Sequence, residues 1–227
     1  VVGSIFVNPA QFDDPDDLRA YPRDLEADLE TLSSAGCSAV FAPDARSVYP
    51  DGFRFKLHES LLSKRFCGAH RPGHFDGVLT VVMKLLILTD PSRAYFGEKD
   101  YQQYALVRDM AREFFLPCSI VPCPIVREAS GLAMSSRNER LPGGSRQAAG
   151  MLHEALLASA TPDDALGALE RQGFIVDYVE DFYDRDTDST RRLAAARLGG
   201  VRLIDNISVP AQRMPAPSET RERSNER

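Results

Sequence analysis

The sequence has few of the residues from which disulfide frameworks and metal centres are built. No two of its four cysteines form a CxxC pair, and its four histidines form no HExxH or other compact ligand spacing. Cysteines in apolar surroundings are typical of buried free thiols in a reducing cytosol, with disulfide or metal roles as the alternatives. The cysteines are Cys37, Cys67, Cys118 and Cys123. The sequence therefore predicts no metal site made by protein side chains.

The chain also lacks an excess of positive charge and a long apolar run. Its formal net charge is −6, whereas a nucleic-acid-binding face needs many cations for phosphate contacts. The run from Val78 to Leu88 contains Lys84 and is shorter than the roughly 20 residues that span a bilayer. No signal peptide is visible. We therefore expect a cytoplasmic protein that binds neither nucleic acid nor membranes, although a few local cations would suffice for a compact anionic substrate.

What the sequence does contain is an alternation of apolar runs and amphipathic segments. The nearly continuous apolar run from Val1 to Val7 predicts a parallel strand buried on both faces. Further strands are expected at 38–42, 94–96 and 119–122, helices at 24–35 and 101–114, and a helical or buried segment at 78–88. This alternation predicts an α/β fold with a doubly wound parallel sheet.

The character of the sequence changes after Pro142-Gly143-Gly144. Alanine-rich helices are expected at 147–160 and 162–172, with short strands at 174–178 and 201–204, which indicates a smaller α+β unit. We therefore expect one domain over residues 1–125, a smaller one over 126–212, and a disordered tail over 213–227. Because the first strand begins at residue 1 without a methionine, we also expect a βα unit upstream of it.

A charged motif follows the expected strand at 94–96. Its residues are Gly97, Glu98, Lys99 and Asp100. They lie before a helix, at the position where α/β sheets bind ligands. Gly97 permits close backbone approach, Lys99 offers an ammonium to phosphate oxygens, and the free N–H groups of the helix add positive potential. The motif predicts a triphosphate site, although alone it is also typical of a charged turn.

A second polar segment lies downstream, after Gly131. It comprises Met134, Ser135, Ser136, Arg137 and Asn138. Two hydroxyls, several backbone donors and an arginine that can hold phosphate with two hydrogen bonds favour a mobile phosphate clamp. The alternative interpretation is a solvated linker before Pro142.

Three further side chains are candidates for the same crevice. Gln11 follows the first strand, so its amide can reach a carboxylate or hydroxyl there, and Gln103 lies one helical turn beyond Asp100. His74 is an acid/base candidate by type, or a structural histidine that caps the following helix. Tyr21-Pro22-Arg23 and Asp205-Asn206-Ile207 are equally typical of turns.

Taken together, these motifs resemble the pantothenate synthetase (pantoate–β-alanine ligase) family from Val1 to about Leu141, and more weakly as far as Asn206. The segments that carry the resemblance are Ser4 to Phe12, Tyr21 to Arg23, Phe41 to Pro43, Tyr49 to Gly52, Arg71 to Val78, Phe96 to Gln103 and Gly131 to Asn138.

The resemblance implies a Rossmann-like fold of nucleotidyltransferase type, a smaller C-terminal lid domain and a homodimer. It also implies that pantoate and β-alanine are joined with consumption of Mg²⁺-bound ATP through a pantoyl adenylate. Lys99 and Arg137 are then expected to stabilise the transition state. Gln11 and Gln103 are expected to hold pantoate, and Gln11 also β-alanine. The residues implied in ATP binding are Gly97, Glu98, Lys99, Asp100 (at the ribose), Val126, Met134, Ser135, Ser136 and Arg137.

The sequence departs from the family pattern in one important respect. The family carries an HxGH motif, with its proposed catalytic histidine, on its first βα turn, and these 227 residues contain none. We expect that motif upstream of Val1. Two alternatives stay open from the sequence: a truncated, non-catalytic nucleotide- or pantoate-binding remnant, and another nucleotidyltransferase.

Overall fold

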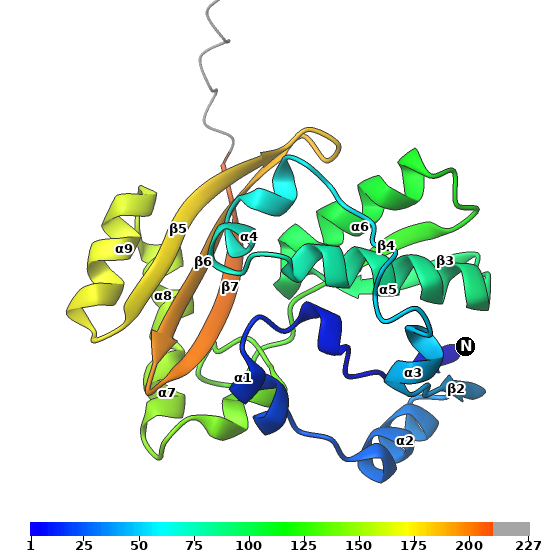
Figure 1. Cartoon of the computed structure of the whole chain (residues 1–227). Coiled ribbons are helices and arrows are strands. Elements are labelled where there is room, and N and C mark those ends of the chain that lie inside the picture. The colour runs from blue at the N-terminus through cyan, green and yellow to red at the C-terminus, as the bar shows by residue number, and fades with distance from the viewer. Residues whose placement is uncertain (211–227) are drawn as a thin grey trace, which may run out of the picture.

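The computed structural model describes residues 1–210, which form two packed parts (Figure 1). The strands are β1 (Val2–Ser4), β2 (Ala39–Phe41), β3 (Arg93–Gly97), β4 (Ser119–Cys123), β5 (Ile175–Asp184), β6 (Ser189–Leu198) and β7 (Val201–Val209). The α-helices are α1 (Pro15–Ala20), α2 (Leu25–Ser34), α3 (Ala45–Val48), α4 (Cys67–His70), α5 (His74–Thr89), α6 (Tyr101–Glu113), α7 (Ser145–Ala149), α8 (Met151–Ala158) and α9 (Pro162–Arg171). Short 3-10 helices are η1 (Pro9–Gln11), η2 (Leu62–Lys64), η3 (Glu98–Asp100) and η4 (Ser136–Arg140).

The first part contains parallel strands joined through helices, as the alternating sequence pattern predicts. β1 pairs with β2 in parallel, with Gly3 opposite Val40, and β3 pairs with β4 in parallel, with Tyr95 opposite Val121. Helices α5 and α6 pack against each other, and α6 also contacts β3 and β4. Parallel strands with helical crossovers place their carboxyl ends at one edge. The predicted α/β class is therefore confirmed.

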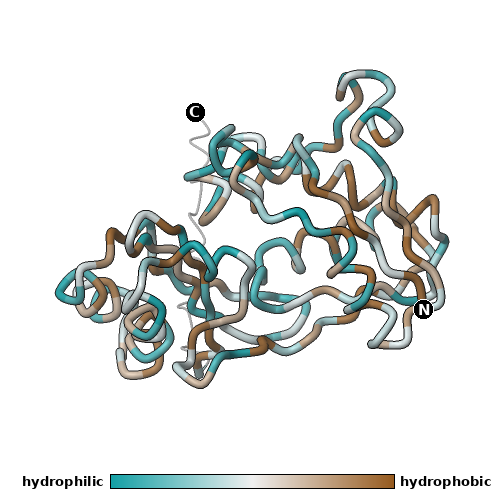
Figure 2. Tube along the Cα trace, turned by 90° about the horizontal axis from the view of Figure 1, so that it is seen from below, coloured by the Kyte–Doolittle hydropathy of each residue, from teal (hydrophilic) through white to brown (hydrophobic). Residues whose placement is uncertain are grey.

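The prediction that the N-terminal run is buried on both faces is wrong for the described residues. Val1 is 81% exposed and Val2 56% exposed, and the chain beside the N-terminus is coloured as hydrophobic in Figure 2. β1 pairs with β2 along one edge, and no other strand within residues 1–210 pairs with the second edge. Apolarity gives a strand the capacity to be buried, but burial also requires neighbours on both faces.

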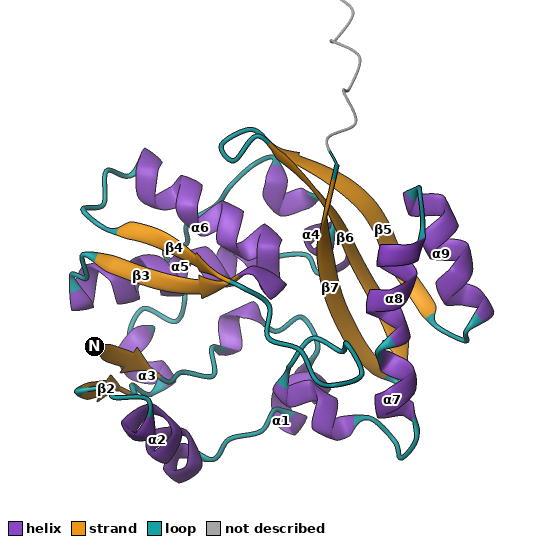
Figure 3. Ribbon diagram, turned by 180° about the vertical axis from the view of Figure 1, so that it is seen from behind, coloured by secondary structure: helices purple, strands orange, loops and turns teal. Residues whose placement is uncertain are grey.

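The second part is an antiparallel sheet in the order β5-β6-β7 (Figure 3). Helices α8 and α9 cover one of its faces, where they contact β7 and β5. Strand β6 was not predicted from the sequence, and β5 and β7 are longer than expected. The run Leu193 to Ala196 has strong helical propensity, but it is buried in the central strand. Its small side chains fit between α8 and α9 on one face of the sheet and the first part of the molecule on the other. Tertiary packing has overridden local propensity here.

The hydrophobic core crosses the boundary between the two parts. Phe66, Phe75 and Leu79 from the first part belong to one buried cluster with Tyr178 and Leu193 from the antiparallel sheet. A second cluster lies between α8, α9 and the other face of that sheet. The candidate active site lies at this junction. The expected tail over 213–227 falls outside the described residues.

Two other sequence-based expectations concern cysteines and membranes. The four cysteines are free thiols, but only Cys67 is buried and the other three are partly exposed. Among residues 1–210, none of the helices combines the length and the apolarity that a bilayer crossing needs.

Candidate active site

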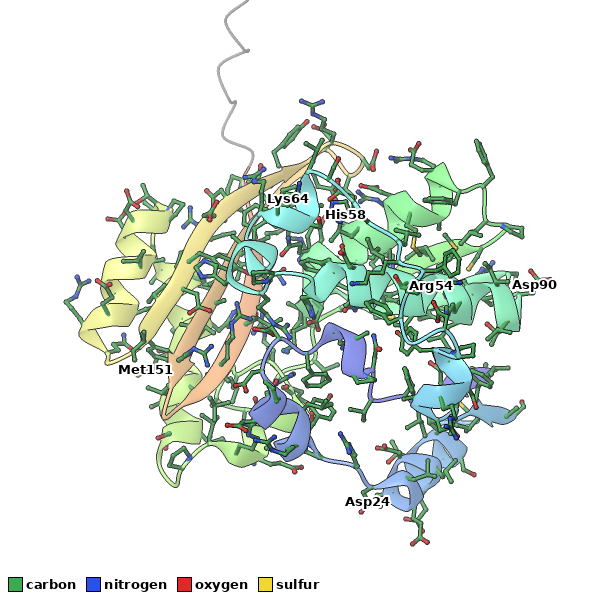
Figure 4. All side chains as sticks on the ribbon, in the orientation of Figure 1. Asp24, Arg54, His58, Lys64, Asp90 and Met151 are labelled. Carbon is green, nitrogen blue, oxygen red and sulfur yellow. The ribbon has the colours of Figure 1, made fainter. Side chains whose placement is uncertain are left out.

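A cavity of about 140 Å³ lies where the start of α6 approaches β7, α1 and η4. In Figure 4, side chains crowd the region between α1 and β7, whereas the labelled Asp24, Asp90 and Met151 lie towards the outer edge of the molecule. The cations that line the cavity are Arg71, Lys99, Arg137, Arg140, Arg197 and Arg202, and the carboxylates are Asp13, Asp14, Asp17 and Asp100. Six cations against four carboxylates give this cavity a positive balance, although the whole chain is acidic. It therefore favours an anionic ligand.

The motif from Gly97 to Asp100 is held in place by β7. Asn206 is only 1% exposed, and its side-chain amide donates to the backbone oxygens of Glu98 (2.8 Å) and Lys99 (3.1 Å). The Glu98 carboxylate accepts from Arg191 on β6. The Glu98 side chain is thus used to anchor the motif, while Lys99 and Asp100 line the cavity. The turn interpretation of 205–207 is wrong, because these residues belong to β7.

The segment from Met134 to Asn138 is an anchored turn rather than a solvated linker. Asn138 is 2% exposed, and its amide donates to the Ala133 backbone oxygen (3.1 Å) and to Glu128 (2.9 Å). Ser135 caps η4 by accepting from the backbone N–H of Arg137. This anchoring directs Ser135 and Arg137 into the cavity that Lys99 also lines. The two motifs are distant in sequence and meet in space.

Asp17 holds two arginines of η4. Its two carboxylate oxygens accept from Arg137 (2.8 Å) and Arg140 (2.6 Å). Burial acts to raise the pKa of Asp17. The hydrogen bonds and charges of the two arginines together lower it by more than burial raises it, so the pKa of Asp17 lies below its ordinary value. The Arg137 guanidinium also lies 5.1 Å from the centre of the Tyr21 ring. Arg137 is thus oriented before any anion enters the cavity.

Gln103 lies on a smaller cavity of about 40 Å³ next to the first one. Lys99, Asp100 and Arg71 line both cavities, and His74 lines the smaller one with Gln103. Gln103 and Asp100 therefore face a shared space, which is consistent with their separation by one helical turn.

Gln11 ends η1, which is fixed by a buried asparagine. Asn8 is 2% exposed; its amide donates to the Gly77 backbone oxygen (3.1 Å) and to the side-chain oxygen of Gln11 (3.0 Å), and its own oxygen accepts from Tyr49 (2.7 Å). A Cβ at Gly77 would lie 2.3 Å from the Ala10 backbone oxygen, so only glycine lets α5 approach η1 this closely. With its oxygen occupied, the Gln11 amide presents its N–H groups as donors.

The expected site residues divide into two sets. Lys99, Asp100, Ser135, Arg137 and Gln103 line the adjoining cavities. The others line neither of these two cavities: Gln11 on η1, Gly97 at the end of β3, Glu98 turned to Arg191, Ser136 bonded to Tyr21, and Val126 and Met134 at 66% and 55% exposure. The Met134 backbone N–H donates to the Val126 oxygen (2.9 Å), which joins these last two.

Asp17, Arg191 and Asn8 are among the supporting residues that sequence reasoning missed. Asp17 and Arg191 each contact a predicted site residue across more than 90 positions, and Asn8 anchors one from three positions away. Only Asn8 carried a local signal, because an asparagine before proline is typical of a cap. No periodicity in the sequence predicts the other two contacts.

The sequence model of the family described as pantoate-beta-alanine ligase matches residues 1–208. The chain belongs to this family. Pantothenate synthetase from Bdellovibrio bacteriovorus is 49% identical over 209 residues, covering 92% of this chain and 81% of that protein. Pantothenate synthetase from Ruegeria pomeroyi is 48% identical over 228 residues, covering 92% of this chain and 80% of that protein. The family expected from the motifs is thus confirmed.

Solved structures of pantoate-beta-alanine ligases share this fold. The crystal structure of pantothenate synthetase from Thermus thermophilus aligns with a TM-score of 0.82 at 42% identity, covering 91% of this chain and 82% of that one. The Francisella tularensis pantoate-beta-alanine ligase, complexed with beta-gamma ATP and beta-alanine, aligns with a TM-score of 0.83 at 36% identity, covering 91% and 78%. The predicted nucleotidyltransferase-type fold with a smaller C-terminal unit is confirmed by these neighbours.

Proposed function

We propose that this chain uses ATP to condense pantoate with β-alanine. A pantoate carboxylate oxygen attacks the α-phosphorus of ATP and pyrophosphate leaves, which gives pantoyl adenylate. The β-alanine amine then attacks the acyl carbon, loses a proton, and displaces AMP, which keeps the attacking oxygen. The observation that carries the proposal is the meeting of Lys99 and Arg137 in one positively lined cavity, beside a second cavity with Gln103.

In this proposal, the two cations neutralise phosphate charge that grows in the first step. Lys99 acts as a movable ammonium and Arg137 as a planar fork of donors, and both act mainly by electrostatic stabilisation. Asp100 takes the ribose hydroxyls. The open space beside Gly97, where a Cβ would meet no atom within 4 Å, suits close approach of the nucleotide to the backbone. The remaining contacts to ATP are assigned to Glu98, Val126, Met134, Ser135 and Ser136.

We further propose that Mg²⁺ arrives on the ATP phosphates. Within residues 1–210 no group of three or more His, Cys, Asp or Glu side chains is arranged to hold a metal. Two of the carboxylates that line the cavity are already paired with arginines: Asp13 with Arg71, and Asp17 with Arg137 and Arg140. When bound, Mg²⁺ would supply charge neutralisation to the phosphates.

We also propose that the two parts of the molecule contribute different residues to the reaction. Residues 1–125 carry the pantoate-binding glutamines and Lys99, and residues 126–212 supply Arg137 as part of a lid. The protein acts as a cytoplasmic homodimer. Two observations support the proposed division: the chain belongs to the family, and η4, which carries Arg137, contacts β7.

Release of AMP tests the proposed function. Purified protein is incubated with MgATP, with and without pantoate and β-alanine, while calorimetry measures ATP binding in parallel. We expect AMP to accumulate only when both other substrates are present. ATP binding without any AMP would favour a non-catalytic binding remnant, and AMP release independent of pantoate would favour another nucleotidyltransferase. Either result contradicts the proposal.

Replacing Gln11 by alanine tests the pantoate site. Loss of a hydrogen bond to a charged ligand costs about 1.5–3 kcal/mol, so KM for pantoate should rise by roughly 10- to 150-fold. KM for ATP should change much less, because the phosphate cations are untouched. Gln147→Ala, which removes an exposed glutamine on α7, is the matched control. An unaltered KM for pantoate would remove Gln11 from the site.

A further inference from the structure

His74 joins two segments of the candidate active site. It is the first residue of α5 and is 9% exposed. Its Nδ1 lies 2.7 Å from the backbone oxygen of Gln11, and its Nε2 lies 3.2 Å from Nη1 of Arg71. The Phe75 ring packs edge-on against the imidazole at a centroid distance of 4.8 Å. The orientation of the imidazole is therefore fixed by two polar contacts and by the packing of Phe75.

These two contacts admit only one protonation form of the ring. A backbone oxygen only accepts hydrogen bonds, so Nδ1 must carry the proton. A guanidinium only donates, so Nε2 must offer its lone pair. The imidazolium would place a second N–H against Arg71, with two like charges in contact. Geometry alone thus selects the neutral tautomer with hydrogen on Nδ1.

Arg71 extends the same network to the cavity wall. Its Nε donates to Asp13 (2.7 Å) and its Nη2 donates to the Gln11 backbone oxygen (3.3 Å). The Gln11 oxygen therefore receives hydrogen bonds from both His74 and Arg71. Arg71 lines both cavities, so the network connects the Gln11 backbone to the surface that faces the substrates.

We infer that His74 is a positioning residue, which holds the Gln11 main chain and the Arg71 guanidinium in place through its neutral Nδ1–H tautomer. It acts through these two groups and exchanges no proton with the substrates. The inference rests on the proposed use of Gln11 for pantoate. It replaces both earlier interpretations of His74, the acid/base catalyst and the simple helix cap, because both ring nitrogens contact groups outside α5.

The titration behaviour of His74 supports this role. Burial is the largest influence and lowers its pKa, and the Arg71 charge lowers it further. The hydrogen bond to Gln11 and the charges of Asp13 and Asp100 act in the opposite direction, and the resulting pKa is about 4. The ring therefore stays neutral at the pH at which the reaction would run.

Nitrogen NMR of the intact, ¹⁵N-histidine-labelled protein tests the tautomer without any assay of activity. The His74 signal, assigned by its loss in His74→Phe, should show a protonated Nδ1 and an unprotonated Nε2 at about pH 7. It should hold these shifts down to about pH 5.5. The reversed tautomer, or a protonated ring at about pH 7, would overturn the inference.

Three substitutions separate the two contacts. His74→Phe removes both, His74→Asn can still donate towards Gln11, and His74→Gln can still accept from Arg71. Leaving a buried donor or acceptor unpaired should raise KM for pantoate by roughly 10- to 100-fold in His74→Phe, with partial rescue in His74→Asn. KM for ATP should change by less than about 3-fold. If His74→Phe does not fold, KM for pantoate of the Asn and Gln variants is compared with that of the wild type instead.

The outcomes distinguish this inference from the proposed function. Wild-type protein that forms no AMP contradicts the proposed function, whatever the NMR spectrum shows. Active variants with unchanged KM for pantoate contradict the positioning role. An ascending limb of the pH–rate profile at about pH 6.5 that disappears in His74→Gln would identify an acid/base catalyst instead.

Discussion

Alanine at Lys99 or at Arg137 is expected to lower kcat/KM for AMP formation by roughly 30- to 900-fold, which corresponds to about 2–4 kcal/mol of transition-state stabilisation. Both side chains line the cavity in which the two motifs meet. Phosphate charge becomes redistributed as pyrophosphate leaves, and donors in a partly enclosed site stabilise that charge more than water does. Steady-state kinetics with ATP varied at saturating pantoate and β-alanine measures the effect.

The pattern of the kinetic constants shows how each cation acts. A cation that acts only on the transition state lowers kcat and kcat/KM equally, whereas one that binds ATP in the ground state also raises KM. Arg137 is already oriented by Asp17, so Arg137→Lys should recover little, because a single ammonium cannot reproduce the planar fork. Arg171→Ala, at an exposed arginine on α9, is the control. Unchanged adenylate formation in both alanine variants would contradict the assigned roles.

Replacing Asp184 by alanine is expected to destabilise the fold by about 3 kcal/mol, because it leaves buried donors without their partner. Asp184 is 2% exposed and accepts from Tyr101 (2.7 Å) and from both terminal nitrogens of Arg108 (2.7 and 3.1 Å). These bonds join α6 to β5, and so connect the two parts of the molecule. Arg108 keeps ion pairs with Asp109 and Asp186, which limits the loss to the lower end of the range for buried pairs.

Urea unfolding at neutral pH measures this loss, with Glu30→Ala on the exposed face of α2 as the control. The pH dependence gives a second test. Burial acts to raise the pKa of Asp184, but the hydrogen bonds from Arg108 and Tyr101 lower it more, so its folded pKa lies below the unfolded value. The stabilisation is therefore complete above the unfolded pKa of about 3.9 and is lost as the pH falls through the folded pKa.

Asp184→Asn cannot titrate, so the difference in free energy of unfolding between wild type and this variant should shrink as the pH is lowered from about 5 to about 2. A difference that stays constant over that range would show that the Asp184 charge does not contribute. Equal stability of wild type and Asp184→Ala would show that the junction between α6 and β5 does not depend on this residue.

Local patterns in the sequence predicted most of the parallel part of the fold. Helices α2 and α6 and strands β2, β3 and β4 lie within a few residues of their expected bounds, because each has a distinct apolar period and a clear stop signal. The central strand β6 was missed for the opposite reason. Its alanines favour a helix locally, and only pairing with β5 and β7 on both sides makes it a strand.

The candidate site was predictable where chemistry follows directly from a strand end. Lys99 and Asp100, which line the cavity, follow directly after β3, and the carboxyl ends of parallel strands are where such folds bind ligands. Asp17 and Asn206 were not predictable as site residues, because their roles depend on contacts 120 and 108 positions away in the chain. Such contacts are set by the packing of α1 and β7 and have no local signal.

The proposed function requires that a pantoate carboxylate oxygen attacks the α-phosphorus of ATP in this site. The most direct test uses pantoate labelled with ¹⁸O in both carboxylate oxygens and analyses the products by mass spectrometry after turnover with MgATP and β-alanine. We predict that each AMP carries one labelled oxygen and that each pantothenate keeps the other at its new amide carbonyl. AMP without label, or label in pyrophosphate or inorganic phosphate, would contradict this route.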